Sequence, residues 1–196
     1  HILPHWTWPG REGEVTPIFV YTNYPTAELF INGKSYGKQS KNNSSLKNRY
    51  RLMWMDTKYE PGEVKVVAYD KNGKAVAEKV VRTAGKPHHI ELVSNRNELT
   101  ADGKDLAYVT VKVVDKDGNL CPADNRQINF SVKGTGKYRA AANGDPTNLE
   151  QFHLPKMHAF NGMLTAILQA GETAGEIVFT VKANGVKAGN IRIQTK

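Results

Sequence analysis

The segment Ile177-Val178-Phe179-Thr180-Val181-Lys182-Ala183, followed by Asn184-Gly185, carries the pattern that decides the fold. Apolar residues occupy every second position from Ile177 onward, and the other positions are mostly polar. Successive side chains of a β-strand point to opposite faces, so this strand would bury one face and expose the other, as antiparallel sheets do. The Asn-Gly pair supplies the positive φ that a tight hairpin needs.

The same period of two recurs along the chain, and no convincing amphipathic helix accompanies it. Alternating segments lie at 64–69, 109–113, 128–132 and 190–194. Further hairpin signals are Asn32-Gly33, Asn72-Gly73, Asp117-Gly118 and Asn161-Gly162. Many short strands separated by regular turns predict an all-β fold made of two tandem immunoglobulin-like antiparallel β-sandwiches.

A boundary is expected near Thr83-Ala-Gly-Lys-Pro87, where Gly85 and Pro87 would interrupt a strand. We therefore expect a linker from a preceding domain at 1–15, a first sandwich at 16–85 and a second, immunoglobulin-like sandwich at 86–196. Two stretches do not have a strand pattern. Residues 40–48 are expected to form a polar loop, and 134–160 a long loop of the kind that is often functional.

Composition excludes several classes of function. The 196 residues are 39% hydrophobic and contain no run of about 18 apolar residues, so no membrane span is expected. The formal charge is +8, but the lysines are spread along the chain, which favours a solvated surface over a nucleic-acid partner. The single cysteine, Cys121, cannot form an internal disulfide and is expected to be a structural or incidental thiol.

No motif predicts a cofactor or a metal. His88 and His89 would point to opposite faces of a strand and would not easily share one ion. The stretch 115–119 begins like a calcium loop, but glycine stands at its fourth position and Arg126 at its twelfth, so a turn is expected. Zinc-protease and phosphate-loop motifs are absent from the sequence.

Glycoside hydrolysis needs two carboxylates on a rigid frame. Spacing along the chain does not exclude a pair such as Asp145 and Glu150, but both fall in the predicted long loop, which has no visible supporting scaffold. We expect no catalytic residue within this chain.

The aromatic opening, His1-Ile-Leu-Pro-His5-Trp6-Thr-Trp8-Pro9-Gly10, is the remaining candidate for a site. Its flat apolar rings with polar edges suit stacking on sugar rings. The alternative is packing against a neighbouring domain. That alternative is favoured for Trp8, and for Trp6 the two interpretations are closer.

The chain resembles bacterial β-galactosidases of glycoside hydrolase family 2. The opening through Arg11 and the run Tyr21-Thr22-Asn23 to Glu28-Leu29-Phe30-Ile31-Asn32-Gly33 resemble the region after their catalytic barrel and the β-sandwich that follows it. Three further segments resemble the C-terminal sandwich of these enzymes: Leu99-Thr-Ala-Asp102-Gly103, Asn143-Gly144-Asp145-Pro146-Thr147 and Ala159-Phe160-Asn161-Gly162. The resemblance covers nearly the whole chain.

The resemblance implies a parent enzyme that removes terminal β-galactosyl residues with retention, through two glutamates of a barrel upstream of His1. Neither glutamate corresponds to a residue here. The family's His-Trp segment returns toward the barrel mouth, so His5, Trp6 and Trp8 are the candidate substrate-binding residues of the intact enzyme. The expected partners are that barrel and a galactoside, with a homo-oligomer as a further option, in the periplasm or outside a bacterial cell.

Three functions stay open for the two sandwiches. The first is a non-catalytic accessory region that braces the barrel. The second is a carbohydrate-binding module, for which Tyr36, Tyr50, Tyr138 or Phe152 would supply aromatic surface. The third is an adhesin-like tandem of immunoglobulin-like domains, which composition permits and the order of the motifs disfavours.

Overall fold

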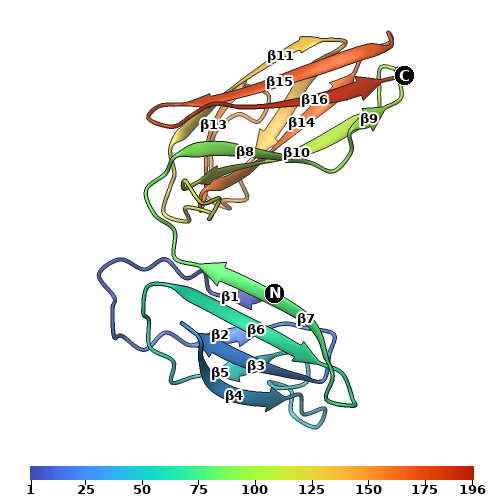
Figure 1. Cartoon of the computed structure of the whole chain (residues 1–196). Helices are drawn as coiled ribbons and strands as arrows, with labels where there is room; N and C mark the ends of the chain where they lie inside the picture. The colour runs from blue at the N-terminus through green and yellow to red at the C-terminus, as the bar shows by residue number, and fades with distance from the viewer. The chain divides into compact units, whose positions relative to one another are not determined.

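The computed structural model in Figure 1 describes all 196 residues, and every regular element in it is a β-strand. The all-β prediction is confirmed, and no helix is long and apolar enough to cross a membrane. The chain divides into two compact units, His1–Ala84 and Gly85–Lys196. Residues 1–15, expected as a linker, belong to the first unit, where Ile2 pairs with Val20.

The first unit contains two antiparallel sheets. One has the order β1-β2-β5 and the other the order β4-β3-β6-β7. The strands of the first sheet are β1 (Ile2–Leu3), β2 (Ile18–Val20) and β5 (Leu52–Trp54). Those of the second are β3 (Thr26–Ile31), β4 (Lys34–Ser40), β6 (Glu63–Tyr69) and β7 (Ala75–Arg82).

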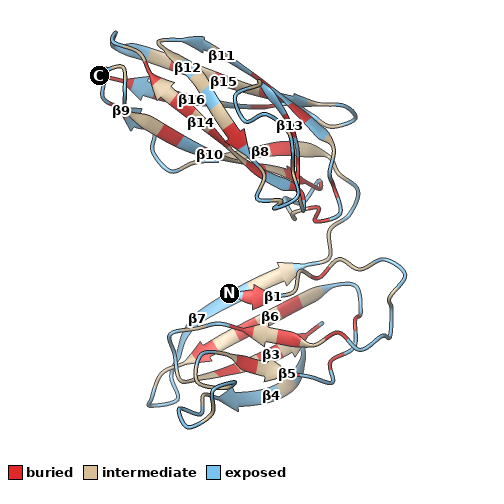
Figure 2. Ribbon diagram, turned by 180° about the vertical axis from the view of Figure 1, so that it is seen from behind, coloured by how far each residue is buried: buried red, intermediate tan, exposed pale blue.

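The core of the first unit lies between these sheets and follows the alternation in the sequence. On β6, every second residue from Val64 to Ala68 is buried, and Leu29 on the neighbouring β3 is opposite Val66. Ile18 and Trp54 enter the same core from the other sheet. Figure 2 shows these buried positions alternating with paler ones along the strands.

The second unit also has two sheets, with the orders β12-β14-β10-β8 and β13-β11-β15-β16-β9. The first sheet comprises β8 (His89–Ser94), β10 (Leu106–Val114), β12 (Gly136–Ala142) and β14 (Met163–Ala170). The second comprises β9 (Glu98–Leu99), β11 (Gln127–Gly134), β13 (Lys156–His158), β15 (Gly175–Ala183) and β16 (Gly189–Thr195). All pairings are antiparallel except that of β9 with β16.

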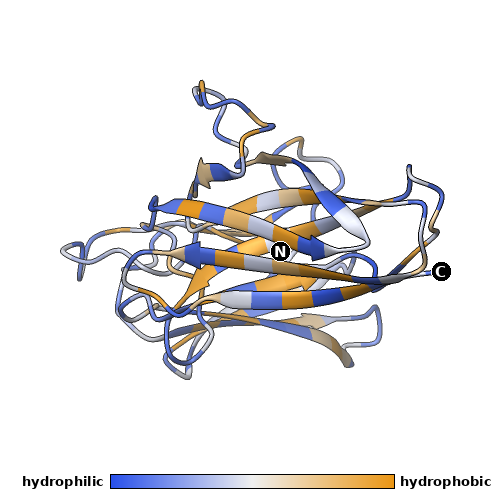
Figure 3. Cartoon of the chain, turned by 90° about the horizontal axis from the view of Figure 1, so that it is seen from above, coloured by the Kyte–Doolittle hydropathy of each residue, from blue (hydrophilic) through white to orange (hydrophobic).

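Strand β15 is central to the second core, as its sequence predicts. Ile177, Phe179 and Val181 are fully buried, and the ring of Phe179 stacks on that of Phe130 with centroids 5.9 Å apart. Figure 3 shows the hydrophobic and hydrophilic residues alternating along the strands. With Cys121 as a lone free thiol, burial of these apolar faces is the main source of stability.

The loop predicted at 134–160 is shorter in the structure, and the prediction for His88 and His89 is wrong. The stretch 134–160 contains β12 and β13, so its loop spans only 143–155. Strand β12 is an edge strand with three alanines and one glycine, and it lacks the alternating bulky apolar residues that mark a strand. The prediction for His88 and His89 also fails. Their Nδ1 atoms lie 3.0 Å apart, because β8 starts at His89 and the alternation does not extend to His88.

The turn predicted at 115–119 is present, and Asp115 organises it. The buried carboxylate accepts hydrogen bonds from the backbone N–H groups of Gly85, Asp117 and Asn119 at 2.8–2.9 Å. Burial raises the pKa of Asp115, but these hydrogen bonds, with one from the Asn119 side chain, outweigh it and hold the pKa at about 2.

We predict that Asp115 stabilises the fold above about pH 4 and stops doing so near pH 2, because its folded pKa is below that of the unfolded chain. The contribution is about 2 kcal/mol, and it disappears as the pH falls through that window. Denaturant titrations of the wild type and Asp115→Asn would measure it. The difference in unfolding free energy between the wild type and Asp115→Asn should shrink as the pH falls. A difference that stays constant with pH would contradict the lowered pKa of Asp115.

We also predict that Gly134 tolerates no side chain. Its φ is +94°, and an added Cβ would lie 1.9 Å from the carbonyl oxygen of Glu176 on β15. Gly118 has a similar φ of +83° with nothing within 4 Å, so it is a matched control. Gly134→Ala should cost about 3 kcal/mol or more of unfolding free energy and Gly118→Ala about 1. Equal costs in denaturant titrations would refute the backbone clash.

Candidate functional site

The opening segment is built into the first unit by backbone hydrogen bonds. The Gly13 N–H donates to the Tyr59 carbonyl and the Tyr59 N–H to that of Glu14, both at 2.9 Å. The Thr16 N–H donates to the Thr57 carbonyl at 2.7 Å. The candidate residues His5, Trp6 and Trp8 therefore stand on an ordered segment.

Trp6 is buried, with 1% of its surface exposed. Its indole N–H donates to the Glu60 carbonyl at 2.8 Å, and its ring meets that of Tyr59 edge to face at 5.2 Å. The Thr83 hydroxyl donates to the Trp6 carbonyl at 2.6 Å, which ties the segment to the end of the unit. In this structure Trp6 has no free face for a sugar and acts as a core residue.

His5 and Trp8 are half-buried and stack on each other, with ring centroids 4.0 Å apart. The Trp8 indole N–H donates to the His5 carbonyl at 2.9 Å, and the Arg11 guanidinium lies 5.1 Å from the ring centroid of Trp8. A hydrogen bond from Arg11 to Glu14, 2.8 Å long, holds the guanidinium there. Two of the three candidate residues, His5 and Trp8, thus belong to one small cluster at the surface.

The His5 ring is suited to hydrogen bonding in its neutral form. Burial lowers its pKa, and its Nδ1 accepts from the Thr7 N–H at 3.3 Å. This contact places the proton of the neutral ring on Nε2. A neutral imidazole that stacks on an indole and donates from Nε2 can contact a hydroxyl-bearing ligand.

The four aromatics considered as a platform are divided between the two units. Tyr36 and Tyr50 lie in the first unit, and Tyr138 and Phe152 in the second. The Tyr138 hydroxyl donates to the carbonyls of Phe152 and Leu154, and its ring stacks on Phe130. Burial raises the pKa of Tyr138 to about 12. Tyr138 is therefore a structural residue that ties down the loop after β12.

Cys121 is also structural. Burial raises its pKa to about 11, and the nearby carboxylates of Asp115 and Asp124 add to the shift. A thiol with this pKa is almost entirely protonated at neutral pH and is a poor nucleophile. No group of three or more histidine, cysteine or acidic side chains is placed to hold a metal ion.

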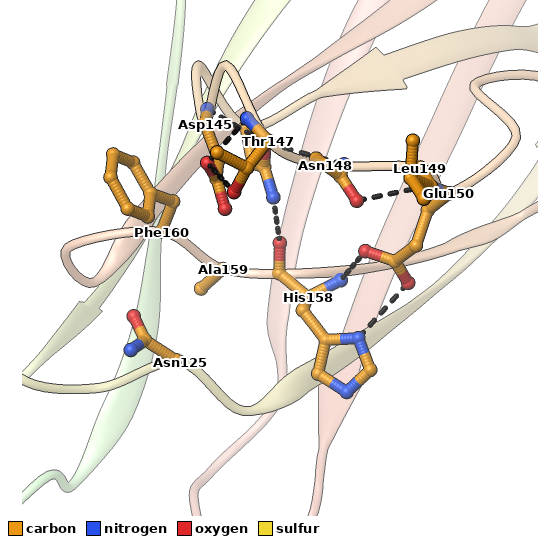
Figure 4. A pocket seen from close by; sticks show the side chains of 10 residues that line it. Asn125, Asp145, Thr147, Asn148, Leu149, Glu150, His158, Ala159 and Phe160 are labelled. Atoms are coloured by element: carbon orange, nitrogen blue, oxygen red, sulfur yellow. Dashed lines mark hydrogen bonds and ion pairs between the residues drawn. The ribbon is translucent and has the colours of Figure 1, made fainter.

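The second unit contains a cleft built mainly from the segment 134–160, which the sequence predicted to be a long loop of the kind that is often functional. Its volume is about 540 Å³, and both Asp145 and Glu150 line it (Figure 4). The remaining lining residues are Asn125, Asn143, Thr147, Asn148, Leu149, His158, Ala159 and Phe160. The loop 143–155 brings them together with residues of two other segments. The resemblance involved five of these residues, which are Asn143, Asp145, Thr147, Ala159 and Phe160, and the predicted long loop also covered Asn148, Leu149, Glu150 and His158. Neither placed Asn125 beside them.

Sequence comparisons place the chain among glycosidases. Residues 90–192 match the family described as glycoside hydrolase family 2 C-terminal domain 5, and residues 13–77 match a domain of unknown function, DUF4982. A β-galactosidase of Bacteroides ovatus is 40% identical over the whole chain, which covers 22% of that protein. A β-galactosidase of Thermoanaerobacter pseudethanolicus is 27% identical over 91% of the chain, which covers 24% of it.

Solved structures agree with these matches. A β-glycosidase from Bacteroides vulgatus superposes on 99% of the chain with a TM-score of 0.89 and 31% identity. A family 2 glycosyl hydrolase from Bacteroides cellulosilyticus gives a TM-score of 0.85, also with 31% identity over 99% of the chain. In both, the chain covers 24% of the solved protein. The chain belongs to glycoside hydrolase family 2 and corresponds to the C-terminal part of its enzymes.

Proposed function

We propose that this chain is the non-catalytic C-terminal accessory region of a β-galactosidase-like enzyme, where it braces an upstream catalytic barrel. The observation that carries the proposal is the match of the entire chain to less than a quarter of a β-galactosidase at 40% identity. An adhesin-like tandem of domains has no comparable support, because the family match covers most of the second unit. A periplasmic or extracellular location in a bacterium belongs to the same proposal.

The first unit supports the bracing role through its opening segment. Strand β1 pairs with β2, and the stretch up to Thr16 is fixed to residues 57–59 by the hydrogen bonds described above. The Ala84 N–H donates to the Thr7 hydroxyl at 2.9 Å, so both ends of the unit are joined. A domain preceding His1 would connect to an ordered segment, and its orientation would be restrained.

We also propose that His5 and Trp8 border the sugar site of the intact enzyme. Both keep accessible surface, and the neutral His5 ring has its Nε2 available to a hydroxyl. Trp6, which lies between them in the chain, is held in the core. The Thr83 hydroxyl donates to its carbonyl, and its indole N–H donates to the Glu60 carbonyl. The partners in this proposal are the barrel and a galactoside, and an assembly of several copies is compatible with it.

The bracing role predicts that removing residues 85–196 from the intact enzyme lowers the thermal midpoint of its catalytic domain. If the second unit contributes to the bracing, its loss removes stabilising contacts, and a shift of about 5 °C would correspond to roughly 2 kcal/mol for a domain of barrel size. Calorimetry of the intact and shortened enzymes measures it. The 196-residue chain alone should not hydrolyse an aryl β-galactoside. An unchanged midpoint, or activity of the isolated chain, would overturn the proposal.

The sugar-border role predicts that Trp8→Ala in the intact enzyme lowers kcat/KM for an aryl β-galactoside about tenfold, because the platform that holds His5 is lost. Tyr36→Ala is the matched control, since Tyr36 is also partly buried and packs on the same core. It should leave kcat/KM within about twofold. Similar losses in both variants would show a general effect on the fold and not a role at the sugar.

A further inference from the structure

The cleft of the second unit is a shallow, open hollow with a volume of about 540 Å³, and its wall is rigid. Its loop is fixed to β13 at two points. The Asn143 side chain donates to the His158 carbonyl at 3.0 Å, and the Glu150 carboxylate accepts from the His158 N–H at 3.0 Å. The cleft wall is therefore held in place without a ligand.

Three side chains in the cleft each have one polar atom engaged and another free. Asp145 accepts from the Thr147 N–H and hydroxyl through Oδ1, which leaves Oδ2 (Figure 4). Asn125 accepts from the Asn161 N–H through Oδ1, which leaves its Nδ2 donor. His158 donates from Nδ1 to Glu150 Oε1 at 3.0 Å, which leaves Nε2. Side chains oriented in this way lose little freedom when a ligand binds.

Further contacts position these groups. Asn143 Oδ1 accepts from the Asp145 N–H at 3.0 Å and fixes the turn that carries the carboxylate. Asn148 Oδ1 accepts from the Glu150 N–H at 3.0 Å, which places the partner of His158. The polar atoms that remain free are two acceptors and one donor. A ring hydroxyl both donates and accepts, so this mixture suits a polyol.

Apolar surface borders the same polar groups. Phe160 is half-buried, and Leu149 is 95% exposed on the loop. The C–H face of a sugar ring packs on surfaces of this kind while its hydroxyls reach the polar groups. The lining includes two carboxylates and no lysine or arginine, so an acidic sugar would be repelled.

We propose that this cleft of the second unit is a binding site for a neutral saccharide. Phe160 supplies the stacking surface, and Asp145, Asn125 and His158 supply hydrogen bonds to ring hydroxyls. The site would hold glycan on the second unit and raise its concentration near the enzyme. It does not depend on the roles proposed for His5 and Trp8, which lie in the first unit.

Calorimetric titration of the 196-residue chain tests the site. The probes are methyl β-galactopyranoside, methyl β-glucopyranoside, methyl β-xylopyranoside and, as the acidic comparison, methyl β-glucuronide. We expect at least one neutral glycoside to bind with a millimolar or tighter dissociation constant, and the glucuronide to bind more weakly. Phe160→Ala should weaken binding about fivefold, as expected for loss of an aromatic contact.

Two further variants separate the site from the fold. Asp145→Asn keeps the Oδ1 acceptor of the turn and replaces the free acceptor with a donor, so it should weaken binding with an unchanged thermal midpoint. Glu172→Gln removes a carboxylate from a different cleft of the same unit and should leave binding intact. Trp8→Ala should also leave it intact.

Three outcomes would overturn the proposal. They are no binding of any neutral glycoside at millimolar concentration, equal affinity for the glucuronide, and binding that survives both Phe160→Ala and Asp145→Asn. A loss of binding in Trp8→Ala alone would transfer the sugar to the opening segment, which would refute the cleft and support the first-unit proposal.

Discussion

Face-to-face packing of two sheets is the constraint on which each unit depends. A strand can contribute to such a core only if its apolar side chains recur at every second position. In β15 the buried residues Ile177, Phe179 and Val181 meet this requirement, and β6 meets it in the first unit. The outward positions can then carry charged side chains, so the residues behind the net charge of +8 do not have to be buried in either core.

The aromatic opening shows how the same constraint can absorb residues that look functional. Tryptophan suits a sugar platform and a core equally well, because it combines a large apolar area with one donor. At Trp6 the donor is satisfied by the Glu60 carbonyl and the ring by Tyr59, so burial decides its role. Trp8 instead stacks on His5 and lies near the Arg11 guanidinium, and this His5–Trp8 pair stays at the surface. Two positions along the chain thus separate a core residue from a candidate contact.

The sequence is sufficient where local pattern and tertiary environment agree. Alternating segments such as 64–69 and 177–183 and the Asn-Gly turns correctly predict strands and hairpins, and Asn32 and Asn161 adopt the positive φ that such turns need. The sequence is insufficient where a strand forms only through backbone pairing with its neighbour and carries no alternating apolar side chains. Strand β12 is held by β14 along one edge and needs little apolar area of its own, so its alanines and single glycine do not produce a strand pattern.

The geometry of the cleft was beyond prediction for a related reason. Separation along the chain does not exclude Asp145 and Glu150 as a catalytic pair, and it assigns them no other role. What gives them a role is the return of the chain in β13, which sets His158 against Glu150 and Asn143. Hydrogen bonds between positions 143, 150 and 158 depend on the pairing of β13 with β11, a long-range contact. A scaffold and a ligand site are compatible here because the sheets supply rigidity, and the connection between two edge strands supplies the polar groups.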